Sequence, residues 1–235
     1  MIKKIFKYFI WTILFILAIF FIAKFSGPRL LKMYIDSGMG DCSKIPVLCM
    51  SPSQDIFDPP LNKDFLAELI PKEFPKVNIS APKGFAVVQE LIKKPYYKEK
   101  RNRYKDSVIY ILHLEKGYFC DLYPQVKKIG INDNYAFINR LMNAKSTNIK
   151  GIDDAFFVIM KSIFTPDLGD QKWLVMARFE LSGRKGFINY NIFGKQRYFD
   201  CNIIDKDGSY FKVYIKDKSG VLDLSEAFTI ISTIK

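Results

Sequence analysis

The sequence predicts an α+β protein in which an N-terminal transmembrane helix precedes an antiparallel sheet packed with helices, an α/β/α-like sandwich. Two observations predict this class. An uninterrupted apolar run occupies residues 8–23, between Lys7 and Lys24. Residues 172–235 contain four strand-like segments with short turns and then an apolar helical stripe, which is typical of α+β domains. We expect three parts: a cytoplasmic N-terminus and signal anchor (1–25), a stalk helix and irregular connector (26–75), and a globular domain (76–235).

The apolar run YFIWTILFILAIFFIA contains 16 residues, and all are apolar or aromatic except Thr12. A helix of this length spans about 24 Å, which is less than the ~30 Å hydrocarbon core of a bilayer. Lys7 and Lys24 complete the span, because a lysine stem lies in the membrane while its ammonium reaches the headgroups. No small-residue cleavage pattern follows in residues 22–28. We therefore expect an uncleaved anchor that contacts the lipid bilayer through residues 8–23.

The orientation of this anchor rests on its flanking charges, which are nearly balanced: Lys3, Lys4 and Lys7 before it, and Lys24, Arg29 and Lys32 after it. The short, wholly basic N-terminus favours a cytoplasmic end. The C-terminal domain then lies outside the cytoplasm, anchored by a single pass in a bacterial inner membrane. A cytosol-facing tethered domain is the alternative.

Residues 26–75 predict a connector with little regular structure. Gly27 and Pro28 end the membrane helix, and PRLLKMYIDSG predicts a short amphipathic helix. The following stretch is rich in Gly, Pro, Ser and Asp and predicts a loop. It contains Cys42 and Cys49, our candidate disulfide, which would close an eight-residue loop. Outside the cytoplasm such a bond stabilises the fold by about 2.5 kcal/mol; in the cytosol both thiols would stay reduced.

The first half of the globular domain mixes strands and helices. A helical turn around Lys63–Ile70 precedes it. The patterns then predict, in order, a β-hairpin of Val77–Ile79 and Phe85–Leu91, strands over Val108–Leu114 and Tyr118–Tyr123, a helix capped by Asn132 or Asp133 and running through Met142, and a helix opened by Asp153 or Asp154 and running through Ile163.

The second half of the domain predicts a four-stranded meander, because each strand pattern is followed by a short turn sequence. The expected strands are Lys172–Leu181, Gly186–Phe193, Arg197–Ile204 and Ser209–Lys216. Asp223 and Glu226 then form a capping box. It opens a helix with one apolar stripe: Ala227, Ile230, Ile231 and Ile234.

Taken together, a hairpin with a Pro-x-Gly-Phe turn (82–85), helices, a meander with the Tyr210-Phe211 strand and a terminal helix ending in Ile-Ile-Ser-x-Ile (230–234) resemble the PsbP-like fold. Extrinsic photosystem subunits and several bacterial proteins share that fold. The resemblance covers about residues 75–235, concerns the fold and transfers no functional residue. It implies a binding or assembly module rather than an enzyme.

The residues predict no catalytic, cofactor-binding or metal site. His113 is the single histidine, and we interpret it as an ordinary strand residue in preference to a partner of Cys120 on an adjacent strand. Zinc is not expected, because the chain contains no Cys-x-x-Cys pair. Asp205–Gly208 resembles the start of a calcium loop, but Lys216 occupies the position of its bidentate Glu.

One basic stretch suggests an anionic surface contact, and a solvated hairpin loop is the competing interpretation. Its cations are Lys93, Lys94, Lys98, Lys100, Arg101, Arg103 and Lys105, and three tyrosines are interleaved with them. With a net charge of +12, the expected partners are an anionic envelope component or another membrane protein, not nucleic acid.

We therefore expect a membrane-anchored protein whose periplasmic α+β domain is a non-catalytic binding or assembly module of the cell envelope. The alternatives are a membrane-tethered enzyme with a site built from scattered polar residues and the cytosol-facing tethered domain.

Overall fold

The computed structural model describes residues 45–90, 107–166, 168 and 173–235, together with six isolated positions between 27 and 42. The apolar run 8–23 and the basic stretch 93–105 lie outside the described residues. None of the helices in the described part has the length and apolar character needed to cross a bilayer. The described residues form an α+β fold.

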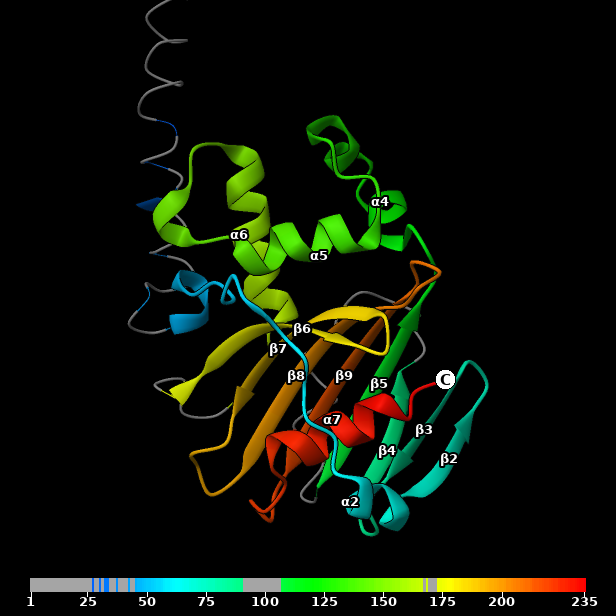
Figure 1. Ribbon diagram of the computed structural model, residues 1–235. Coiled ribbons are helices and arrows are strands. Elements are labelled where there is room, and N and C mark those ends of the chain that lie inside the picture. The colour runs from blue at the N-terminus through cyan, green and yellow to red at the C-terminus, as the bar shows by residue number, and fades with distance from the viewer. Residues whose placement is uncertain are drawn as a thin grey trace, which may run out of the picture.

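A seven-stranded mixed sheet forms the centre of the domain, with strand order β1-β6-β7-β8-β9-β5-β4 (Figure 1). The strands are β1 (Ile56–Phe57), β4 (Ala86–Glu90), β5 (Val108–Leu114), β6 (Val175–Leu181), β7 (Arg184–Asn191), β8 (Arg197–Ile204) and β9 (Tyr210–Asp217). Strands β6 to β9 form the predicted antiparallel meander, and β5 pairs antiparallel with β9.

Both edges of the sheet correct our expectation of an antiparallel sheet. The pairs β1–β6 and β4–β5 are parallel. A parallel neighbour needs a long connection, whereas a two-residue turn gives an antiparallel one. The chain between β4 and β5 runs from residue 91 to residue 107, which is long enough for such a crossover.

Helices cover both faces of this sheet. On one face lie α5 (Asn134–Asn143) and α6 (Ile152–Phe164); on the other lies α7 (Leu224–Ser232), as Figure 1 shows. We call the first group, with its short neighbours, the helix layer. Those neighbours are η1 (Pro46–Cys49), α4 (Tyr118–Leu122), η2 (Pro124–Ile129) and η3 (Ser146–Asn148). Beside α7 pack α2 (Lys63–Glu68) and a two-stranded sheet of β2 (Ile70–Phe74) and β3 (Val77–Ala81).

The predicted hairpin of Val77–Ile79 with Phe85–Leu91 is wrong. Strand β3 pairs with β2, while β4 belongs to the large sheet. The turn at Pro82 does form, with the Phe85 amide donating to its carbonyl at 3.2 Å. The free edge of β3 is instead occupied by the C-terminus, because Asn78 and Lys235 exchange two backbone hydrogen bonds of 2.9 and 3.0 Å.

The predicted strand over Tyr118–Tyr123 is also wrong, because this segment is helix α4. A short apolar run has no periodicity that separates helix from strand. Here Gly117, at φ 76°, turns the chain, and the Phe119 ring stacks on Phe137 of α5 at 4.6 Å between centroids. Cys120 therefore lies on a helix and not on a strand beside His113.

Capping explains where the predicted helices begin. Asp133 caps α5 by accepting a 2.7 Å hydrogen bond from the Ala136 amide. The capping box of Asp223 and Glu226 opens α7, as predicted. Gly151, rather than Asp153 or Asp154, is the N-cap of α6.

Candidate functional site

The connector contains a disulfide that lies against the helix layer. Cys42 and Cys49 are bonded, with Cα atoms 5.7 Å apart. The short helix η1 lies inside the closed loop and buries Val47 and Leu48 in the core of the helix layer. This part of the connector therefore packs on the domain.

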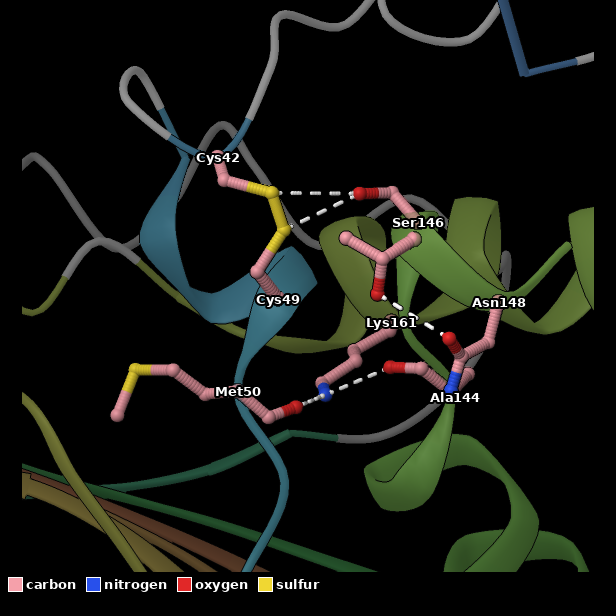
Figure 2. Close-up of a disulfide and its surroundings, with 8 residues drawn as sticks. Cys42, Cys49, Met50, Ala144, Ser146, Asn148 and Lys161 are labelled. Atoms are coloured by element: carbon pink, nitrogen blue, oxygen red, sulfur yellow. Dashed lines mark hydrogen bonds between the residues drawn. A yellow bond between two sulfur atoms is a disulfide. The ribbon is translucent and has the colours of Figure 1, made fainter.

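A buried serine contacts both sulfurs of the disulfide (Figure 2). The Ser146 hydroxyl, in η3, lies 3.4 Å from Cys42 Sγ and 3.2 Å from Cys49 Sγ. A disulfide sulfur carries no hydrogen, so the hydroxyl is the donor and the sulfurs are weak acceptors. The disulfide loop thus contacts the segment that follows α5.

Lys161 of α6 also links the connector to the segment at the end of α5. Its side chain has no exposed surface, and Figure 2 shows it reaching between the connector and the end of α5. Its Nζ donates to three carbonyl oxygens, of Met50 at 2.7 Å, Met142 at 2.8 Å and Ala144 at 3.0 Å. Three acceptors match the three N–H donors of an ammonium. We call the disulfide, Ser146, Lys161 and these carbonyls the clasp.

The protonation of Lys161 is shifted toward neutral pH. Burial, and secondarily repulsion from Lys145, lower the pKa of the Lys161 ammonium from 10.5 to about 7, because both disfavour the charged form. Its described partners are carbonyl oxygens, and no described carboxylate forms an ion pair with it. A neutral amine has only two N–H donors, so deprotonation leaves one carbonyl of the clasp without its hydrogen bond.

A second buried group lies on the sheet beneath α6. Lys212 Nζ lies 3.1 Å from Asp200 Oδ1 and donates to Phe164 O at 2.5 Å. Asn189 Nδ2 donates to Asp200 Oδ2 at 3.3 Å, and the Tyr210 hydroxyl to Asn202 Oδ1 at 2.7 Å. We call these five side chains the strand cluster. All five are buried, so the cluster stabilises the interior and none of its side chains faces solvent.

An open hollow lies on the outer side of α5 and α6. One part, of about 450 Å³, is lined by Ile129, Ile131, Arg140, Lys150, Gly151, Asp153 and Asp154. An adjoining part, of about 250 Å³, shares three of these residues and adds Asn143, Ala144, Lys145 and Asn148. We call both parts the basic hollow. Ala144 also belongs to the clasp, so the two sites share one loop.

The other cysteines and the histidine occupy structural positions. The His113 ring packs on Phe211 at 4.8 Å between centroids. Cys120 Sγ contacts Ile131 O at 3.6 Å, and burial raises the pKa of its thiol. Cys201 is buried on β8, as its predicted strand requires, and burial raises the pKa of its thiol further. The described residues contain no group of three His, Cys, Asp or Glu side chains that could hold a metal ion.

The large net charge is concentrated outside the described domain. Residues 1–44 and 91–106 each contain seven Lys or Arg and two Asp or Glu, a net +5 apiece. The remaining residues together carry only +2 of the total +12. The predicted anionic contact of Lys93, Lys94, Lys98, Lys100, Arg101, Arg103 and Lys105 therefore stays a prediction.

Sequence reasoning missed Lys161, Asp200 and Lys212, and it did not anticipate the basic hollow. Comparison with known proteins adds no assignment to these sites: no protein-family model matches the chain, and no curated protein matches it.

Proposed function

We propose that the protein is a single-pass, membrane-anchored module whose domain lies outside the cytoplasm and binds, or helps assemble, another component of the cell envelope without catalysis. The observation that carries this proposal is the clasp. A structural disulfide persists in an oxidising compartment and is rare where cellular thiols stay reduced. The Cys42–Cys49 bond therefore supports an extracytoplasmic domain.

The clasp also supports a structural role for the connector. Eighteen residues separate Ala23 from Cys42, a length that reaches at most about 60 Å when extended. Beyond Cys42 the chain is held by the disulfide, by Val47 and Leu48 in the core, and by Lys161. The chain that comes from the anchor therefore joins the domain at its helix layer.

The PsbP-like fold remains part of this proposal. The meander and the closing helix α7 support it, while the hairpin that entered the resemblance does not form. Because that fold serves mainly as a binding or assembly module, the resemblance points to the same class of function.

Thiol labelling of intact cells tests this proposal. A membrane-impermeant maleimide should label the chain only after a membrane-impermeant reductant has opened the disulfide. The Cys42→Ser/Cys49→Ser variant is the matched control, because Cys120 and Cys201 are buried and should stay unlabelled. Labelling that needs membrane permeabilisation but no reductant would place the domain in the cytosol and reject the proposal.

A further inference from the structure

The basic hollow gathers three cations around one opening: Arg140 from α5, Lys145 before η3, and Lys150 before α6. Two of them carry no ion pair within the described residues, namely Lys145 and Lys150. The rest of the domain is nearly neutral, so this concentration of positive charge is local.

The carboxylates of the hollow do not cancel this charge. Asp154 is engaged by the Arg140 guanidinium and accepts a 2.8 Å hydrogen bond from the Lys150 amide. Its charge is therefore used to hold Arg140 in place. Asp153 is exposed beside the opening. Three cations therefore face two carboxylates around the opening, and one of these carboxylates is already paired with Arg140.

The position of Lys145 also favours a bound anion. Its ammonium is close enough to Lys161 to help lower the pKa of that lysine. Two like charges near one loop repel each other, and an anion in the hollow would relieve the repulsion. The loop of residues 143–148 thus has an electrostatic reason to accept a negative ligand.

We propose that the basic hollow binds a phosphate-type anion, as a free phosphate or as the phosphate of a lipid headgroup. Ammonium and guanidinium groups form short, charge-assisted hydrogen bonds with phosphate oxygens. Ile129 and Ile131 add an apolar wall that suits the carbon skeleton of a phosphate ester. The inference deepens the proposed function, since it names the ligand class of the binding module.

A phosphate titration of the full chain tests the site. We would record amide chemical shifts of the isotope-labelled protein in nanodiscs of phosphatidylcholine while adding inorganic phosphate, with sodium chloride at matched ionic strength as reference. We expect saturable shifts at residues 143–145 and 150–151. Lys150→Gln should weaken phosphate binding by about tenfold, the effect of losing one charged hydrogen bond.

Two further variants sharpen the result. Asp153→Asn removes a negative charge from the opening and should tighten binding severalfold. Lys83→Gln, in the exposed turn between β3 and β4, removes the same charge as Lys150→Gln at a distant position and should change nothing. A phosphate response that Lys150→Gln leaves intact, or that sodium chloride reproduces, would overturn the proposal.

Nanodiscs that contain phosphatidic acid distinguish the two sources of phosphate. If the same amides shift there without added phosphate, the ligand is the headgroup; if they shift only with soluble phosphate, it is a free anion. No saturable shift in either arm overturns the site. Because this binding assay does not depend on topology, its failure is separate from a thiol-labelling result that places the domain in the cytosol.

Discussion

The same strands form both faces of the central sheet, but the side chains on the two faces differ in polarity. The face beneath α7 is filled mainly by apolar side chains, and its buried polar residues include Thr229 of α7 and Asp217 at the end of β9. The opposite face carries the strand cluster, and α6 above it carries Lys161. Both faces are packed by apolar side chains, and the face beneath α6 adds buried charges and hydrogen bonds to its apolar core.

The difference teaches how the helix layer is held in place. Apolar burial is non-directional, so it stabilises α7 without specifying its contacts atom by atom. On the other face each buried lysine reaches the C-terminal end of a helix. Lys161 donates to carbonyls at the end of α5, and Lys212 donates to Phe164, the last residue of α6. A cation there satisfies carbonyls that lack a helical partner and suits the helix dipole.

Breaking the strand cluster should have the largest effect on stability. Lys212→Met leaves the Asp200 carboxylate buried without its counter-ion, which should lower the free energy of unfolding by about 3–5 kcal/mol. Urea unfolding of the full chain in mild detergent, followed by near-ultraviolet circular dichroism, measures this loss.

A double variant separates charge from packing at this position. Asp200→Asn combined with Lys212→Met removes both charges and should regain most of the lost stability, because no ion is then left unpaired. Equal losses in the single and double variants would mean that the cluster acts through packing, and the contrast between the faces would fail.

The second prediction uses pH to isolate Lys161. Its pKa is about 7 in the folded chain and 10.5 without burial, so below pH 7 both states are protonated and the burial penalty is complete. From pH 7 upward the unfolded chain binds the extra proton. The free energy of unfolding should therefore rise with pH, by up to about 1.4 kcal/mol per unit.

The comparison variant for this titration is Lys161→Met, which lacks the ionisable group. Unfolding curves between pH 7 and pH 9 should show a rise in the wild type that is absent from the variant. Parallel pH profiles for the two proteins would contradict a neutral-range pKa for Lys161 and remove protonation from the description of the clasp.

The sequence predicted those parts of the fold whose determinants are local. Short turns specify the neighbours in the β6–β9 meander, and the capping box specifies the start of α7. The hairpin after Val77 failed because β3 pairs with the strand that precedes it, β2, across the short turn at residues 75–76, while the distant C-terminal Lys235 takes its other edge. The strand after Gly117 failed for a non-local reason, since the Phe119 ring packs against Phe137 of α5.

The sites were harder to predict than the fold, although one signal was present. Asn189, Asp200 and Lys212 lie on three strands, and each stands between two apolar or aromatic residues of its own strand. Such alternation indicates a solvated face. The strand pattern alone does not show that α6 covers this face, because α6 lies elsewhere in the sequence. Lys161, by contrast, lies four residues after Phe157 and three before Phe164, inside an apolar stripe. A lysine at that spacing on a buried stripe is a sign that it has internal partners.

The third prediction tests the apolar face by volume. Gly186 of β7 lies beneath the Phe179 ring, and a Cβ there would meet that ring and approach Asn202 O to 2.8 Å. Phe179 cannot simply move away, because it packs on Phe228 at 4.8 Å between centroids. Gly186→Ala should therefore cost about 1–3 kcal/mol, measured by the same urea unfolding.

Combining Gly186→Ala with Phe179→Leu sharpens this result. The smaller side chain relieves the clash with the ring, so the double variant should lose less stability than the sum of the two single variants. Strict additivity would show that the ring and the glycine do not constrain each other.

The smallest effect should come from the cap of α7. The Asp223 carboxylate accepts a 2.8 Å hydrogen bond from the Glu226 amide, and the Glu226 carboxylate accepts one of 2.8 Å from the Asp223 amide. Asp223→Ala removes the first of these bonds from an exposed helix end and should cost about 1 kcal/mol. Because Asp223 lies on the α7 side of the sheet, away from Lys161, the rise in stability between pH 7 and pH 9 should persist unchanged. A variant that lost this rise would link α7 to Lys161 through the sheet, and the two faces would then have to be treated as one coupled unit.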